Sequence, residues 1–305
     1  NSFARWLRVE SEKSQPENEW LIDLYFALFL IISVLTESDQ ACVIGAPEPQ
    51  PIHPIDSQIV KRYAFLQTKA SKKLQQLREK AWQEIESLKL RHDTKAKRLT
   101  LPTGLGKTLI GFYLAGEIQE ESSGPIVYAL PYLSIIEQVT KVSRDAFSPL
   151  GINIIQHHSL SFPQDRQENE SANFAQARFG LEQWNGDLII TTFDQLLYSF
   201  LSVSRAFIHR FFRLPGSVLI LDEVQSLPAR LIPTIDLFLQ SLSEKLGVKI
   251  IYMTATHPPF LKNALFLLNR EKTFFQPLNR TQLKLNIEEK IPFTEFLNTL
   301  PDWIY

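Results

Sequence analysis

The stretch Leu101-Pro-Thr-Gly-Leu-Gly-Lys-Thr108 lies between an apolar run, Arg98–Leu101, and a helical stretch, Leu109–Glu120. A glycine-rich turn that leaves a strand and opens a helix is typical of a phosphate-binding loop. Two glycines, Gly104 and Gly106, let backbone N–H groups turn towards phosphates, and the helix adds the positive end of its dipole. The stretch therefore predicts a nucleotide site in an α/β fold.

Two side chains of this loop have defined roles in such a site. Lys107 can reach the β- and γ-phosphates of ATP, and Thr108 can bind Mg²⁺. The general pattern has glycine where Leu101 stands, so the loop is a variant. The alternative is a turn that contains Gly-Leu-Gly-Lys-Thr by chance, which the preceding strand and the following helix disfavour. We therefore expect ATP and Mg²⁺ as cofactors.

A second apolar run, Val218–Leu221, leads directly into Asp222 and Glu223. Buried strand ends seldom finish in two carboxylates, because each charge must be compensated, and a nucleotide-bound Mg²⁺ provides that compensation. We predict that Asp222 holds the metal with Thr108 and that Glu223 polarises the attacking water. The alternative, a helix N-cap with an acidic first turn, fits poorly beside a phosphate loop. The predicted nucleotide-binding set is Pro102, Thr103, Gly104, Leu105, Gly106, Lys107, Thr108 and Asp222.

From Lys97 onwards, short apolar runs alternate with helical stretches. Such alternation predicts parallel strands that are buried on both faces and joined by right-handed crossovers. The predicted strands are Arg98–Leu101, Ile126–Leu130, Leu188–Thr191, Val218–Leu221 and Lys249–Met253. The fold class is α/β, a parallel sheet with flanking helices, preceded by a small helical segment.

The residues before this sheet predict helices. Residues 19–36 predict one strongly apolar helix, and the proline-rich residues 45–57 cannot continue it. The longest apolar run, Leu24–Leu35, is shorter than the roughly 20 residues that span a bilayer, so we expect a buried helix. Residues 58–98 have a net charge of +8, against −9 for the rest of the chain, and helical apolar spacing. A solvated amphipathic helix is one interpretation of this segment, and a DNA-facing helix is the other.

The composition of the 305-residue chain limits its functional classes. The net charge is −1 and the pI is about 6.7, so any nucleic-acid surface has to be local. The single cysteine, Cys42, excludes an internal disulfide and a cysteine-rich zinc site. Because no basic-then-apolar leader opens the sequence, we expect a cytoplasmic protein without a membrane span.

A third apolar run, Ile250–Met253, ends in Thr254-Ala255-Thr256. Threonines at strand ends are ordinary when taken alone. The order of phosphate loop, Asp-Glu strand and Thr-Ala-Thr strand, however, resembles motifs I, II and III of superfamily 2 helicases. The resemblance implies the RecA-like form of the α/β fold.

Within that superfamily, four segments together resemble the CRISPR-associated helicase-nuclease of type I CRISPR-Cas systems. They are Ala129–Gln138, Ile190–Gln195, Asp222–Pro228 and Met253–Thr256, and the resemblance covers roughly residues 98–285. It implies a motor that hydrolyses ATP and translocates 3′ to 5′ on single-stranded DNA. Such a motor unwinds target DNA that a surveillance complex with guide RNA delivers.

The same resemblance implies roles for individual residues. DNA-backbone contacts are expected at Pro131, Tyr132, Thr191, Thr192 and Gln195. Coupling of hydrolysis to lobe movement is expected at Gln225, Thr254 and Thr256, and the catalytic set is Glu223, Lys107 and Gln225. From the residues alone, Thr191 and Thr192 are also consistent with ordinary strand-end threonines.

The sequence departs from this family near both ends. The family's N-terminal HD nuclease needs several histidines and aspartates, whereas the six histidines here are scattered and only Asp39 resembles a ligand. We expect no nuclease activity from this chain alone, with cleavage in a nuclease domain or subunit elsewhere. No Gln/Gly/Arg-rich motif follows Thr256, so the arginine finger and the second motor lobe are expected to be missing.

The predicted organisation has four parts. Residues 1–57 form a helical segment and proline-rich linker resembling the end of an HD nuclease domain, and residues 58–96 form a basic helical lead-in. Residues 97–270 form the RecA-like ATP-binding lobe 1, and residues 271–305 form a connector towards the second lobe. Two other functions stay open, a non-enzymatic docking module of a CRISPR effector or inhibitor complex and a DEAD-box RNA helicase. Asp222-Glu-Val-Gln225 favours DNA, because the RNA helicases have Asp-Glu-Ala-Asp.

Overall fold

The computed structural model of the chain describes residues 19–48, 50–66, 71–88, 96–119, 124–158, 172–256, 264–268 and 271–278. The strands are β1 (Ala96–Thr100), β2 (Ile126–Leu130), β3 (Ile154–His157), β4 (Leu188–Thr192), β5 (Val218–Asp222), β6 (Lys249–Thr254) and β7 (Leu265–Phe266). The helices are α2 (Glu19–Ile44), α3 (Ser57–Leu66), α4 (Lys72–Ser87), α5 (Lys107–Gln119), α6 (Leu133–Phe147), α7 (Ala172–Glu182), α8 (Phe193–Leu201), α9 (Arg205–Ile208), α10 (Ile232–Leu246) and α11 (Glu271–Phe275).

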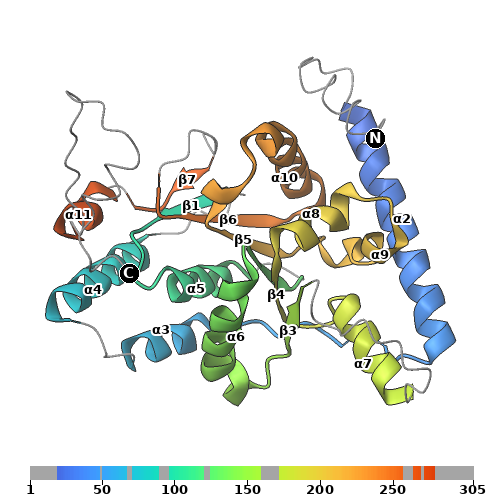
Figure 1. The fold of residues 1–305 in the computed structure, drawn as a ribbon, viewed down its shortest axis with the longest axis horizontal. Coiled ribbons are helices and arrows are strands. Elements are labelled where there is room, and N and C mark those ends of the chain that lie inside the picture. Colours follow the sequence, from blue (N-terminus) through green and yellow to red (C-terminus); the bar gives the residue numbers. More distant parts are fainter. Residues whose placement is uncertain are drawn as a thin grey trace, which may run out of the picture.

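The strands form one seven-stranded sheet in the order β3-β4-β2-β5-β6-β1-β7, and each neighbouring pair is parallel (Figure 1). Helices lie on both faces of the sheet, and the long helix α2 lies beside α9 at one side of the domain. The predicted α/β class, with a parallel sheet, flanking helices and a helical segment in front, is confirmed.

Successive residues of the central strands belong to two different hydrophobic cores. In β2, Ile126 and Tyr128 contribute to one core, whereas Val127 and Ala129 contribute to the other, and β5 and β6 alternate in the same way. Helices α3 to α6 complete the first core, and α2, α8, α9 and α10 complete the second. Since side chains of a strand alternate between faces, the strands of a sheet covered on both sides are apolar at most successive positions.

The predicted strands agree with the structure to within two residues at either end. β1 begins two residues before the predicted Arg98, and β4, β5 and β6 each extend one residue beyond the prediction. The structure adds two edge strands, β3 and β7, that the sequence did not indicate. β3 is only half apolar, with alternating partly buried and buried residues, and β7 has just two residues.

Helix α2 differs from its prediction in both length and burial. It continues to Ile44, and Phe26 and Phe29 pack against Phe211 and Phe238 on one side. The other side leaves large apolar side chains exposed, namely Trp20, Leu24, Leu28, Ile31, Ile32, Val34, Leu35 and Val43. The expectation of a buried helix was therefore wrong, because an all-round apolar sequence does not specify which faces are covered.

The greater length of this helix also affects the argument about membranes. The segment Trp20–Ile44 has 25 residues and contains an 18-residue window with a mean hydropathy of 1.9, so it is long and apolar enough to cross a bilayer. The argument from the shorter run Leu24–Leu35 does not hold for the whole helix. Length and composition alone are weak evidence for a span, since core helices share them. The absence of a membrane span stays a prediction.

The described part of the basic lead-in contains the helices α3 and α4, which contribute to the core of the sheet domain. Helix α4 buries Trp82, whose ring packs edge-on against Tyr113 of α5 with centroids 5.3 Å apart. The chain that leads into α3 passes close to α5 at Gly116. A Cβ at this position would lie 2.6 Å from the Ile55 carbonyl oxygen, so the approach requires glycine. The four-part division stays a prediction, and residues 279–305 of the predicted connector lie outside the described residues.

Candidate nucleotide site and nucleic-acid face

Three neighbouring strands bring the predicted nucleotide residues to one edge of the sheet. In the order β5-β6-β1, Asp222 ends β5, Thr254 ends β6, and the phosphate loop follows β1. The Leu101 N–H donates to the Thr254 carbonyl at 3.2 Å, which ties the start of the loop to β6. Parallel α/β sheets bind ligands at this carboxyl edge.

The phosphate loop requires glycine at two positions. Gly104 has φ of 87° and Gly106 has φ of 85°, in the left-handed region that side chains rarely adopt. The N–H of Ile110 donates to the Gly106 carbonyl at 3.1 Å, so α5 begins directly after the loop. The loop therefore turns sharply and presents the N-terminal end of a 13-residue helix, as a phosphate site needs.

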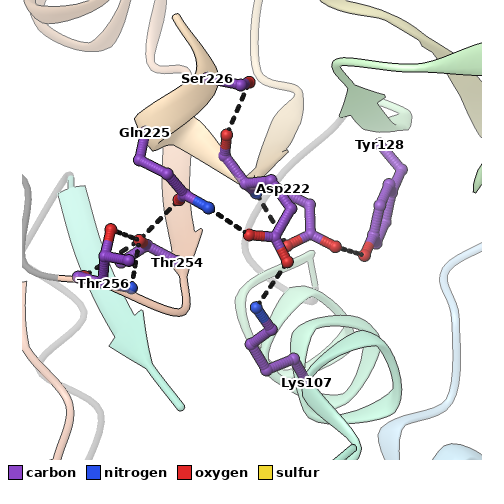
Figure 2. A network of polar contacts seen from close by, with 8 residues as sticks. Lys107, Tyr128, Asp222, Gln225, Ser226, Thr254 and Thr256 are labelled. Atoms are coloured by element: carbon purple, nitrogen blue, oxygen red, sulfur yellow. Dashed lines mark hydrogen bonds and ion pairs between the residues drawn. The ribbon is translucent and has the colours of Figure 1, made fainter. Parts of the chain in front are cut away.

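The phosphate-loop lysine is paired with the second carboxylate of the Asp-Glu box. The Nζ of Lys107 lies 2.8 Å from Oε1 of Glu223 (Figure 2), and their side chains are 8% and 22% exposed. A charge-assisted hydrogen bond between side chains that are mostly buried is stronger than one that is exposed to solvent. A nucleotide phosphate would compete with Glu223 for this ammonium group.

Glu223 has an uncommon backbone conformation that aims its side chain at Lys107. Its φ of 56° and ψ of 44° are left-handed, which costs a residue with a side chain about 1–2 kcal/mol. Two hydrogen bonds offset this cost, since the Glu223 N–H donates to Asp222 Oδ1 at 2.9 Å and the Ser226 hydroxyl donates to the Glu223 carbonyl at 2.8 Å. Such strain at a carboxylate beside a phosphate loop is typical of functional sites.

A chain of hydrogen bonds runs from Glu223 to the end of β6. The Gln225 amide nitrogen donates to Glu223 Oε2, and its oxygen accepts from the Thr254 hydroxyl at 2.7 Å (Figure 2). The Thr254 hydroxyl also accepts from the Thr256 N–H at 3.0 Å. The three residues predicted to couple hydrolysis to movement therefore lie in one continuous network with Lys107.

Tyr128 is a member of the site that the sequence did not reveal. Its hydroxyl donates to Asp222 Oδ2 at 2.8 Å. Burial raises the pKa of Tyr128, and Thr108 lowers it. Burial raises the pKa of Asp222, while Lys107 and the Tyr128 hydrogen bond lower it. Since Asp222 bonds to the Tyr128 hydroxyl and Thr108 influences its pKa, the two predicted metal-binding residues belong to one neighbourhood. Their carboxylate and hydroxyl oxygens fit Mg²⁺.

Replacing Tyr128 tests its effect on the metal. We expect Tyr128→Phe to raise the Mg²⁺ concentration needed for tight ADP binding by about 10-fold, the usual loss when a partner of a metal-binding residue is removed. ADP binding would be titrated against Mg²⁺ by fluorescence, with Tyr198→Phe, an exposed tyrosine, as the control. An unchanged Mg²⁺ requirement would show that Tyr128 does not orient Asp222.

The predicted DNA-contact residues lie at the carboxyl ends of the neighbouring strands β2 and β4 and in the helix α8 that follows β4. Tyr132 is 59% exposed, and Pro131 is partly buried. Thr191, Thr192 and Gln195 are buried, and the Thr192 hydroxyl accepts from the Gln195 N–H at 3.3 Å to cap α8. The five residues lie at one edge of the sheet with different exposure, and their DNA contacts stay predictions.

A buried arginine lies behind this edge, and the sequence did not single it out. Arg210 donates through Nη1 to Gln195 Oε1 at 2.7 Å and through Nε to the Glu182 carbonyl at 2.8 Å. Burial lowers the pKa of Arg210 to about 10, so the guanidinium is charged at neutral pH. Burial, and then the charge of Arg210, lower the pKa of His157 to about 2, which keeps that imidazole neutral. Arg210 thus fixes the side chain of Gln195.

The structure gives no support for a second metal centre among the residues it describes. In those ranges, no three or more His, Cys, Asp or Glu side chains are grouped so that they could hold a metal ion. Asp39 is exposed on α2, and His92 lies outside the described residues. The expected lack of nuclease activity stays a prediction.

Comparison with known proteins agrees with this geometry. The sequence profile of the DEAD/DEAH box helicase family matches residues 67–264, which is more than half of the chain. The chain therefore belongs to the DEAD/DEAH box helicases, which are ATP-hydrolysing enzymes. The matched range contains Lys107, Thr108, Asp222 and Glu223, whose individual roles stay predictions.

Individual relatives are more specific. The CRISPR-associated nuclease/helicase Cas3 of Haloferax volcanii is 36% identical over 182 residues, which are 54% of this chain and 19% of that protein. This confirms the resemblance to the CRISPR-associated helicase-nucleases. The chain spans about a fifth of the length of this relative.

Solved structures confirm the RecA-like fold. T. fusca Cas3 with ADP superposes with a TM-score of 0.52 at 19% identity, over 68% of this chain and 23% of that chain. T. fusca Cas3 with AMPPNP gives 0.53 at 17% identity, over 73% and 25%. At these identities the likeness concerns the fold alone.

Proposed function

We propose that this chain is the first ATP-binding lobe of a DNA motor that acts in type I CRISPR interference. The observation that supports it is the network from Lys107 through Glu223 and Gln225 to Thr254. This network joins the phosphate loop to the end of β6, which is the connection a motor needs between hydrolysis and movement. The likeness to Cas3 supports the CRISPR setting.

The residues present divide the hydrolysis of ATP among them. Lys107 leaves Glu223 and binds the β- and γ-phosphates, and Glu223 is then free to orient the attacking water. Thr108 and Asp222 would hold Mg²⁺, which would supply positive charge beside the phosphates. When Glu223 turns to the water, its hydrogen bond with the Gln225 amide breaks or shifts. Gln225 also accepts a hydrogen bond from Thr254, so its movement reaches the end of β6.

The proposed motor acts on nucleic acid at the edge formed by β2 and β4. Tyr132 and Pro131 contact the nucleic-acid backbone directly, while Thr192 and Gln195 stabilise the start of α8 beneath the bound DNA strand. The motor moves 3′ to 5′ along single-stranded DNA in the cytoplasm. Its partners are a surveillance complex with guide RNA and a nuclease domain or subunit.

The dependence of hydrolysis on a second lobe and on DNA tests this proposal. The proposed mechanism takes an arginine from an opposing lobe, which is worth about 10³- to 10⁵-fold in other nucleotide hydrolases, so lobe 1 alone should hydrolyse ATP hardly at all. Adding a second lobe, in cis or as a separate chain, should restore hydrolysis and make it depend on single-stranded DNA.

The controls separate the competing functions. Single-stranded RNA of the same sequence should stimulate ATP hydrolysis less than single-stranded DNA does. Stronger stimulation by RNA would indicate an RNA helicase. Full hydrolysis by the 305-residue chain alone would contradict the two-lobe mechanism. No hydrolysis under any condition, with the site residues intact, would favour a docking module.

A further inference from the structure

Helix α4 places an arginine on the backbone of the phosphate loop. The Nε and Nη2 atoms of Arg78 lie 3.0 and 2.9 Å from the Gly104 carbonyl oxygen. Both hydrogen bonds come from one planar guanidinium. The two N–H donors therefore fix both the position of the Gly104 oxygen and the direction of its C=O bond. Arg78 belongs to the basic segment for which the sequence left a solvated or a DNA-facing role open.

The carbonyl that Arg78 binds determines where a backbone N–H points. A trans peptide is planar, so the Gly104 carbonyl and the Leu105 N–H point in opposite directions. With the carbonyl held by α4, the Leu105 N–H faces the inside of the loop. There it reaches the Pro102 carbonyl at 3.4 Å, which is longer than a good N–H···O bond of about 2.7–3.2 Å. This N–H is therefore only weakly engaged.

This peptide is the part of the loop with the greatest need for support. Gly104, with φ of 87°, has no side chain to limit rotation of the peptide that follows it. A rotated peptide would present the carbonyl oxygen to the phosphates and repel them. α4 can prevent the rotation because it is fixed itself, with Ala81, Trp82 and Ile85 buried and Ser71 capping its first turn.

We propose that Arg78 is a positioning residue for nucleotide binding, which holds the Gly104–Leu105 peptide with its N–H towards the phosphates. The inference rests on the proposed nucleotide site and adds a residue from outside the loop to it. Arg78 acts through the backbone and not through contact with the nucleotide. A lysine cannot replace it fully, because a single ammonium group lacks the planar fork.

Two measurements on the intact chain test this role. The first is hydrogen exchange of residues 102–108 without nucleotide, which we expect to be faster in Arg78→Ala. The second is MgADP affinity, which we expect to fall by about 10-fold, with a smaller loss in Arg78→Lys. Lys73→Ala removes an exposed charge of the same helix and should match the wild type in both.

Each combination of results decides the question. Faster exchange together with weaker MgADP binding supports the proposal. Weaker binding with unchanged exchange would mean that Arg78 touches the nucleotide directly, and this overturns it. Faster or unchanged exchange with normal binding overturns it as well. If the wild-type chain does not bind MgADP, the proposed nucleotide site itself fails, whereas a failure confined to Arg78→Ala leaves that site standing.

Discussion

Glu223→Gln is expected to stop ATP turnover while ATP stays bound. The substitution keeps the size of the side chain but removes the carboxylate that orients water, and loss of such a group costs about 10²- to 10⁴-fold in kcat. Lys107 would also lose its charged partner at 2.8 Å and become freely available to phosphate. ATP affinity should therefore be retained or become tighter.

Two assays on the motor with both lobes measure this result. One is steady-state hydrolysis with single-stranded DNA, and the other is equilibrium binding of ATP. Glu244→Gln, an exposed carboxylate on α10, should leave both unchanged. Slow turnover accompanied by weaker ATP binding would indicate that Glu223 serves the fold of the site rather than the chemistry.

Lys107→Ala is expected to abolish useful nucleotide binding. The lysine is 7% exposed and donates to Glu223, so the substitution removes the phosphate contact and leaves two carboxylates close together without it. The loss of a charged hydrogen bond, about 1.5–3 kcal/mol, corresponds to roughly 10- to 150-fold, and repulsion between phosphate and the carboxylates adds to it.

The matched comparison is with another lysine in the same domain. Lys141→Ala on α6 removes an exposed positive charge and should bind MgATP like the wild type. Both variants should be checked for folding by thermal unfolding. Equal MgATP affinity of Lys107→Ala and the wild type would contradict the assignment of the phosphate loop.

The central part of the fold could be predicted because its strands are buried on both faces. β2, β4, β5 and β6 each contain a continuous run of three or more apolar residues, which is typical of strands buried on both faces. The edge strands β3 and β7 could not be found in this way, since an edge strand is partly exposed and its pairing depends on a neighbour distant in sequence. The exposure of α2 was unpredictable for a related reason, because its apolar residues surround the whole helix.

The candidate nucleotide site could be recognised in the sequence where one local segment holds several of its residues. The phosphate loop and the Asp222-Glu223 pair are such segments. Tyr128 was not predictable, because it occupies an interior position of an apolar strand and acquires its role only when β5 lies next to β2. Arg78 is one of twelve basic residues in 58–98, and the sequence does not distinguish it from the others. Only the packing of α4 shows that it hydrogen-bonds to the phosphate loop.

The position of β1 between β6 and β7 has a consequence for synthesis on the ribosome. Thr100 pairs with Thr254, so the strand that leads into the phosphate loop finds its neighbour about 150 residues later. At roughly 5–20 residues per second, translation needs about 8–30 s between the two. During that interval the loop has its sequence but lacks the β6 carbonyl that holds its first residue. Nascent chains should therefore bind nucleotide only after β6 has left the ribosomal exit tunnel. ATP would then bind to, and stabilise, only chains in which β6 has paired with β1.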